Sequence, residues 1–303
     1  QISRLEDLGF GRGLLSGGMA RARQLAKENK AAATQNADIP KIPKGSLGSF
    51  QRGLQSIPLK VKESLGERVL LCHQLLRVEK TLSEGGKPVW VSTFQTPTGV
   101  KVVRSKVLLL TTPSHVTGQL LGGGGGVLPE AQTLCGIRCP PVASVTLAYP
   151  DSAFQVPLRG FGHLIPRLAK IRTLGSIWAS SLFPGRAPAG YTMLTNFIGG
   201  SQDPEITTLT PEQTVAQVHA DLQKLLLRPD APAPRLLSYQ LWARAIPQYE
   251  IGHADILKRL EEGLQGQSGL YLGGNYRTGV AIGDCVQYGV DVAAQVEKYL
   301  RNY

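Results

Sequence analysis

The segment that most constrains the fold lies near the end of the chain. A short apolar run, Leu270–Leu272, stops at Gly273 and Gly274, and an amphipathic segment begins near Gly279. This order predicts a strand, a glycine turn and a helix. The first amides of a helix have no partner within it and carry the positive end of its dipole, and glycine lets a ligand approach the backbone. The segment therefore predicts either a cradle for a phosphate or an electron-rich ring, or a tight turn that binds nothing.

Composition bounds the class of protein. The chain has 303 residues, of which 42% are hydrophobic and 18% charged, as is typical of a globular protein, and its length suggests two domains. A formal net charge of +11 would suit an acidic ligand, an anionic membrane surface or nucleic acid. The basic residues are scattered, however, apart from a modest cluster between Arg159 and Arg172. We therefore expect no nucleic-acid binding.

The cysteines and the apolar runs exclude further classes. Cys72, Cys135, Cys139 and Cys285 form no C-x-x-C pair, and no histidine stands at metal-ligand spacing from Cys135 or Cys139. We expect all four to be packing residues. No apolar run approaches the roughly 18 residues of a membrane-spanning helix, and the first residues lack the apolar region of a signal peptide. Any membrane contact is therefore predicted to be peripheral.

Apolar periodicity predicts the order of the elements in the first half. A helix is expected over residues 54–65, packed beneath a sheet. Short strands are expected at 69–71, 75–78, 89–94, 101–103 and 107–110, with a hairpin turn at 97–99. The five glycines at 122–126 are expected to form a flexible surface loop, because no Lys-Ser/Thr follows them as a phosphate loop requires.

A second set of strands is expected at 142–148, 160–166, 173–178, 191–198 and 236–243. Their apolar side chains on both faces, with glycines at 160, 162 and 175, predict a curved sheet that walls a pocket for a bulky ligand. Thr210-Pro-Glu-Gln213 is a helix start with a capping box, and a further helix is expected at 253–264.

No local arrangement of Ser-His-Asp or Cys-His supports nucleophilic catalysis, and no apolar setting marks out a carboxylate pair. If the chain belongs to an enzyme, we expect a cofactor to supply the chemistry.

Several motifs together resemble one known family. They are Pro43–Gly45 with Gly48–Leu54, Thr112–His115, Ser180–Arg186, Phe197–Ser201, Gly274–Tyr276 and Gly279–Gly283. In this order the chain resembles roughly the C-terminal three-fifths of the oxygen-dependent protoporphyrinogen oxidases of the chloroplast and cyanobacterial type, in the flavin amine oxidase superfamily. The resemblance implies an α/β (α+β) chain with the two-domain FAD-dependent amine-oxidase-like fold, incomplete at the N-terminus.

The resemblance also implies a function. An FAD enzyme of this family oxidises protoporphyrinogen IX to protoporphyrin IX in haem and chlorophyll biosynthesis, with molecular oxygen as the acceptor. Hydride passes to flavin N5 and hydrogen peroxide is released, so no side chain is assigned as catalytic and no metal is expected. The family implies peripheral contact with a chloroplast membrane, or with the cytoplasmic membrane in a cyanobacterium, and leaves a homodimer open.

Site residues follow from the same resemblance. For FAD it implies Val69 at the adenine, Thr112 on the adenosine side and Trp242 beside the isoalloxazine ring. The glycine turn adds Gly274 and Asn275, and the start of the last helix adds Gly279, Val280 and Ala281. For the substrate it implies Leu164 and Ile177 on one side of the tetrapyrrole and Phe197 on the other, with Ile177 standing where the family has leucine.

The expected domains follow the family. Residues 1–44 are the end of a helical substrate- or membrane-associating segment, and 45–121 are the middle part of the FAD-binding domain. Residues 122–250 are a substrate-binding domain with a curved mixed sheet, and 251–303 are the C-terminal strand and helix of the FAD-binding domain. The family's Gly-x-Gly-x-x-Gly fingerprint and its N-terminal arginine for a substrate propionate are both absent, so we expect a fragment of a longer protein.

Two alternatives stay open. One is another flavin enzyme, such as an amine oxidase or a carotenoid desaturase, although Ser181–Arg186 and Phe197–Gly200 favour the porphyrin enzymes. The other is a non-catalytic protein or fragment that binds a tetrapyrrole or a lipid.

Overall fold

The computed structural model describes Met19, Ala22, Arg23, Ala26 and residues 48–303. The helical segment expected over residues 1–44 lies outside the described residues but for those four. The chain divides into two units, residues 1–64 and 65–303.

Helix α3, Ser56–Leu65, lies where a helix was expected from the sequence, and its packing beneath a sheet stays a prediction. None of its residues is buried, and Leu59 and Val61 are both more than half exposed.

A three-stranded antiparallel sheet follows, in the order β1-β2-β3. Its strands are β1 Gln74–Leu82, β2 Pro88–Thr96 and β3 Gly99–Ser105. The hairpin turn expected between β2 and β3 is confirmed. The strand expected at 69–71 is wrong: a 3-10 turn, Gly66–Arg68, ends there and Cys72 has φ 58°, which interrupts extended backbone before β1.

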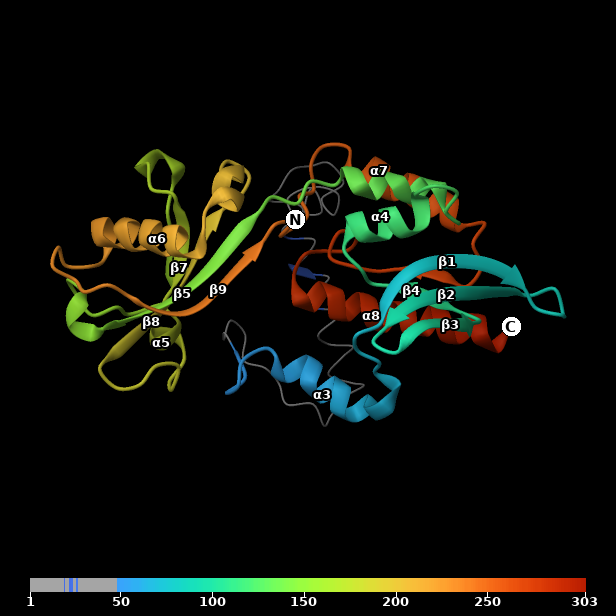
Figure 1. The fold of residues 1–303 in the computed structure, drawn as a ribbon, viewed down its shortest axis with the longest axis horizontal. Helices are drawn as coiled ribbons and strands as arrows, with labels where there is room; N and C mark the ends of the chain where they lie inside the picture. The colour runs from blue at the N-terminus through green and yellow to red at the C-terminus, as the bar shows by residue number, and fades with distance from the viewer. Residues whose placement is uncertain (1–18, 20–21, 24–25, 27–47) are drawn as a thin grey trace. The chain divides into compact units, whose positions relative to one another are not determined.

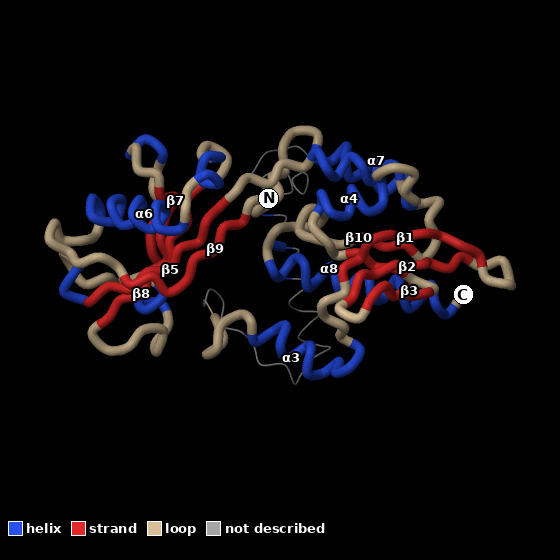
Figure 2. Tube along the Cα trace, in the orientation of Figure 1, coloured by secondary structure: helices blue, strands red, loops and turns tan. Residues whose placement is uncertain are grey.

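A parallel pair of strands joins distant parts of the chain. Strand β4, Leu108–Leu110, aligns with β10, Leu270–Leu272. Helices α4, Ser114–Gly122, and α7, His253–Leu264, lie beside them (Figure 2), with a 3-10 segment at Pro129–Gly136. Their shared core consists of fully or nearly fully buried side chains: Trp90, Leu121, Leu128, Leu134, Leu260, Leu272 and Tyr276.

The five-glycine segment is only partly the flexible loop that was expected. A Cβ at Gly122 would lie 2.3 Å from the backbone nitrogen of Gln132, and one at Gly126 would lie 2.0 Å from the Leu121 carbonyl oxygen. The two ends are therefore packed against backbone, whereas Gly124 and Gly125 face open space.

A five-stranded sheet has the order β6-β7-β8-β5-β9. Its strands are β5 Val142–Pro150, β6 Gly162–Leu164, β7 Thr173–Ile177, β8 Tyr191–Gly199 and β9 Arg235–Trp242. Every pairing is antiparallel, so the expectation of a mixed sheet is wrong: the connections at 165–172 and at 178–190, the second with the one-turn helix α5 (Ala179–Leu182), reverse the chain between neighbouring strands instead of returning it in the same direction.

Helix α6, Pro211–Leu225, covers one face of this sheet (Figure 1). Residues at alternate strand positions pack against it, among them Ala143, Val145, Leu147, Leu194 and Ile198. The expected capping box is confirmed, because Thr210 and Gln213 exchange side-chain and backbone hydrogen bonds. The remaining elements are short helical turns at Asp151–Ala153, Arg167–Ala169, Ala179–Leu182 (α5) and Pro204–Thr208, and the long final helix α8, Ile282–Arg301.

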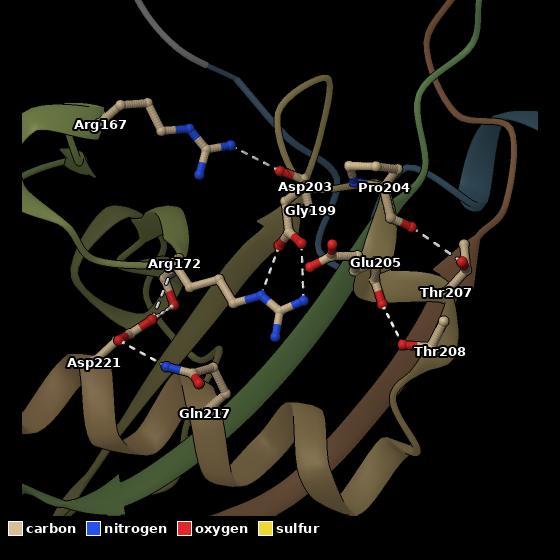
Figure 3. A network of polar contacts seen from close by, with 11 residues as sticks. Arg167, Arg172, Gly199, Asp203, Pro204, Glu205, Thr207, Thr208, Gln217 and Asp221 are labelled. Atoms are coloured by element: carbon tan, nitrogen blue, oxygen red, sulfur yellow. Dashed lines mark hydrogen bonds and ion pairs between the residues drawn. The ribbon is translucent and has the colours of Figure 1, made fainter.

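Charged groups tie α6 and the 204–208 turn to β7 (Figure 3). Arg172 donates to both carboxylate oxygens of Asp203, each at 2.8 Å. Asp221 is 1% exposed and accepts hydrogen bonds from the backbone nitrogen and the Oγ1 of Thr173, each at 2.8 Å. Arg167 donates to the carbonyl oxygen of Gly199 at 2.9 Å, which holds the end of β8.

Replacing Asp221 with alanine is expected to lower the free energy of unfolding by about 3 kcal/mol, because both buried donors of Thr173 lose their acceptor. Urea denaturation measures the change. The matched control is Lys224→Ala: its side chain is 61% exposed and lies 4.0 Å from Asp221, so we expect a loss below about 0.5 kcal/mol. Equal losses in the two variants would contradict the assigned role of Asp221.

Candidate functional site

The loop between β10 and α8 forms the centre of the site. It follows the expected order of strand, glycine turn and helix, with the helix beginning at Ile282. The Gly273 nitrogen donates to the Leu110 carbonyl at 2.8 Å, which carries the pairing of β4 and β10 into the turn. Gly274 has φ +140° and Gly279 has φ +145°, backbone conformations that favour glycine.

The start of α8 presents unpaired hydrogen-bond donors. Its N-cap, Ala281, has no side chain that could accept from the first amides. The Oγ1 of Thr278, just before it, is buried and has no hydrogen-bond partner among the described residues. These groups and the positive end of the dipole of a 20-residue helix suit an electron-rich oxygen or nitrogen of a ligand.

A stacked pair of rings holds the loop from one side. Tyr249 and His253 lie 4.2 Å apart with an interplanar angle of 12°. The Tyr249 hydroxyl donates to the Asn275 carbonyl, and Nε2 of His253 donates to the Tyr276 carbonyl at 2.8 Å. Because a carbonyl only accepts, His253 carries a proton on Nε2.

Arg277 and Tyr288 hold the loop from the other side. Arg277 donates to the Leu272 carbonyl at 2.8 Å and pairs with Glu261, while the Tyr288 hydroxyl also donates to Leu272. The turn is therefore fixed at both ends by side chains from α7 and α8.

The face of the five-stranded sheet opposite α6 supplies the second part of the site. Directly opposed residues in antiparallel strands share a face, so the register aligns Leu164, Gly175, Phe197, Ser144 and Gln240 across the sheet. A neighbouring row on the same face contains Ile177, Thr195 and Thr146. The hydroxyl side chains of this open face, Ser144, Thr146 and Thr195, lie on β5 and β8, and its apolar groups Leu164 and Ile177 lie on β6 and β7.

A cavity of about 460 Å³ lies where the sheet meets the turns. It is lined by Pro113, Ser114, His115, Cys139, Val142, Ser144, Phe197, Trp242, Arg244, Ala245, Ile246, Pro247 and Asn275. Burial lowers the pKa of His115, and the charge of Arg244 lowers it further, so the imidazole is neutral at neutral pH. Burial raises the pKa of the Cys139 thiol, which stays protonated.

The structure brings several of the expected site residues together. Phe197, Trp242 and Asn275 line the cavity. A Cβ on Gly274 would lie 3.6 Å from the Thr112 carbonyl oxygen, so these two expected cofactor residues are neighbours.

Gly279, Val280 and Ala281 lie at the start of α8, with Val280 48% exposed. Val69 follows the 3-10 turn, outside the cavity lining. Leu164, 89% exposed, and Ile177 share the open sheet face with Phe197 but lie outside the cavity lining.

Sequence reasoning missed His115 and Arg244 as parts of the site. His115 ends the motif Thr112–His115, and Arg244 stands two residues after Trp242, in the bend that follows the end of β9. The roles of Tyr249 and His253 as partners of the loop carried no local signal.

The described residues were also compared with the requirements of a metal site and of a membrane-spanning helix. Among the described residues, no three or more His, Cys, Asp or Glu side chains gather in a way that could hold a metal ion. Within the described ranges, none of the helices combines the length and apolar character that a bilayer crossing requires.

Solved structures identify the class of fold. The chain is similar to a structure from Exiguobacterium sp. 255-15 provisionally assigned as a protoporphyrinogen oxidase, with a TM-score of 0.65 and 25% identity over 86% of this chain and 54% of the other. A putrescine oxidase structure gives a TM-score of 0.58 with 16% identity over 82% of this chain and 53% of the other. The fold is thus that of an FAD-dependent amine oxidase.

Sequence comparison gives the family. Residues 2–297 match the profile of the flavin containing amine oxidoreductases, and the chain belongs to this family. It is 39% identical over 96% of its length to protoporphyrinogen oxidase 1, chloroplastic, of Spinacia oleracea, and 37% identical over its whole length to the protein of that name in Arabidopsis thaliana. The chain spans 52% and 56% of these two relatives.

The site fits the flavin that this family binds. The uncapped amides of α8 and the orphaned Thr278 hydroxyl supply donors, and glycine at 274 and 279 keeps the backbone accessible. The expected flavin cofactor is therefore supported by the family and by the chemistry of these donors.

Gly279→Ala is expected to weaken flavin binding about 10-fold or more. Residue 279 has φ +145°, and an added Cβ would lie 2.0 Å from Oδ2 of Asp284 and 2.8 Å from its Cβ, so the start of α8 must shift. Flavin fluorescence anisotropy measures the dissociation constant. Gly283→Ala, where nothing lies within 4 Å of an added Cβ, is the control and should bind flavin as wild type does. Equal binding by both variants would contradict the placement of the flavin at this turn.

Proposed function

We propose that the protein oxidises protoporphyrinogen IX to protoporphyrin IX with FAD as cofactor and molecular oxygen as acceptor, in haem and chlorophyll biosynthesis. The observation that carries this proposal is the 36% to 39% identity to four plant protoporphyrinogen oxidases over 96% to 100% of the chain. The chain covers only about half the length of these relatives. The oxidase activity is therefore proposed for a complete protein that contains this chain.

The geometry supports a flat apolar substrate. Phe197 lies on the open sheet face and lines the cavity together with Trp242, and an aromatic face can stack on a pyrrole ring. Leu164 and Ile177 extend this face toward β6 and would add apolar contact with the same ring system. Ser144 and Thr146 on the same face are small and uncharged, so they leave room for the ring system.

When bound, FAD would supply the redox chemistry, namely a two-electron acceptor for the tetrapyrrole that molecular oxygen reoxidises to give hydrogen peroxide. The chain's own groups would position and desolvate the reactants. The amides at the start of α8 would stabilise negative charge on the ring system next to them. No Asp or Glu lines the cavity, so the pyrrole protons would leave to solvent or move within the ring.

The location follows the same relatives. Four of them are named as chloroplastic, which supports a plastid protein. Peripheral contact with a plastid membrane through residues 1–44 is part of this proposal, because the substrate is apolar.

The activity assay uses the full-length protein supplied with FAD and protoporphyrinogen IX under air. We expect porphyrin fluorescence to rise together with hydrogen peroxide. A protein that binds FAD but leaves the porphyrinogen unchanged would refute the proposal, and a screen with amines and carotenoid precursors would then test the other flavin enzymes. A relative from Bacillus subtilis, 25% identical to this chain, is named coproporphyrinogen III oxidase. Faster turnover of coproporphyrinogen III than of protoporphyrinogen IX would therefore assign coproporphyrinogen III as the substrate.

Phe197→Ala is expected to lower kcat/KM for protoporphyrinogen about 10-fold, because the stacking surface for the tetrapyrrole is lost. The control is Tyr191→Ala on the same strand and face, about 20 Å from Phe197. It should leave kcat/KM within about twofold of wild type. The fluorescence assay measures both variants, and an equal loss would place the substrate elsewhere.

A further inference from the structure

One end of the cavity contains polar groups with few protein partners. Ser114 is 3% exposed, and its Oγ has only the Cys139 thiol beside it as a weak polar neighbour, with no other hydrogen-bond partner among the described residues. Nδ1 of His115 is also buried and unpartnered. A buried polar atom left without a partner costs about 1–3 kcal/mol, so such atoms usually meet a ligand or water.

Arg244 brings an uncompensated positive charge to the same place. Its charge acts on both His115 and Cys139, and the cavity lining contains no Asp or Glu. Among the described carboxylates, none lies within ion-pair distance of Arg244, and Glu250, the nearest acidic residue in sequence, pairs with Arg138.

The backbone fixes where this charge stands. The Ala245 nitrogen donates to the Pro140 carbonyl at 3.1 Å, so the chain directly after Arg244 is tied to the strand that leads into β5. Trp242, two residues earlier, is opposite Val142 on the face that carries Phe197. Arg244 therefore lines the cavity just beyond the end of β9, two residues after Trp242.

We propose that Arg244, Ser114 and His115 form a binding site for an oxyanion at this end of the cavity. The guanidinium and the hydroxyl donate to the anionic oxygens, and the neutral imidazole accepts or donates one further hydrogen bond. Two ligands offer this chemistry: a propionate carboxylate of the porphyrinogen and a phosphate of the dinucleotide. Binding of a porphyrinogen carboxylate rests on the proposed function, whereas binding of a dinucleotide phosphate does not.

The test compares ligands that differ only in the anionic group. Fluorescence titration measures the affinity of the full-length protein for protoporphyrin IX and for its dimethyl ester. Arg244→Gln is expected to weaken binding of the acid about 10-fold and to leave the ester unchanged. Arg244→Lys should restore part of the affinity, and Ser114→Ala should give a smaller loss for the acid alone.

The second arm measures the dissociation constants of FAD and of riboflavin, which lacks the phosphates. A loss of about 10-fold for FAD alone in Arg244→Gln would assign the site to the cofactor phosphate. Arg235→Gln is the matched control, because it removes the same charge from the other end of β9, outside the cavity lining.

The proposal is overturned if Arg244→Gln binds all four ligands as wild type does, or if it loses acid and ester, or FAD and riboflavin, to the same extent. Because these are binding measurements, they remain decisive if the protein fails to oxidise porphyrinogen. If an inactive protein with Arg244→Gln still loses affinity only for the acid or only for FAD, the oxyanion site is supported and the proposed function is refuted. If an active enzyme with Arg244→Gln shows no such selective loss, only the oxyanion site is refuted.

Discussion

The parallel pairing of β4 with β10 is the interaction on which the site depends. Leu108–Leu110 and Leu270–Leu272 are far apart in sequence and align residue for residue. Parallel strands end at the same edge of a sheet, so the turn into α4 and the glycine turn into α8 leave from one edge. This is why Thr112 and Gly274 are neighbours. The cofactor residues expected from motifs at the two ends of the chain meet only through this pairing.

Two antiparallel connections complete the geometry. The segments 138–142 and 242–248 run side by side, joined by hydrogen bonds from Ala245 to Pro140 and from Gln248 to Arg138. They continue from two paired strands of the five-stranded sheet, β5 and the edge strand β9, toward the turns that line the cavity. Phe197 of β8 and Asn275 of the loop after β10 therefore line one cavity.

Local chemistry determined what the sequence could predict. The capping box at Thr210, the helix at 253–264 and the glycine turn before α8 depend on neighbouring residues, and all three were confirmed. The prediction of a strand at 69–71 was wrong because the backbone of Cys72, directly after these apolar residues, is in the left-handed conformation. The partnership of His253 with the Tyr276 carbonyl and the convergence of His115 with Arg244 arise from contacts between distant segments, which periodicity does not encode.

The five-stranded sheet separates folding from recognition. Alternate residues of β5 and β8 form the core with α6, while the residues between them, such as Ser144 and Thr195, face the opposite side. A substitution on the open face leaves the core packing untouched, so this surface can accumulate changes at little thermodynamic cost. If this face receives the tetrapyrrole as proposed, changing every second residue of a strand would alter which molecule it accepts while the packing against α6 stays the same.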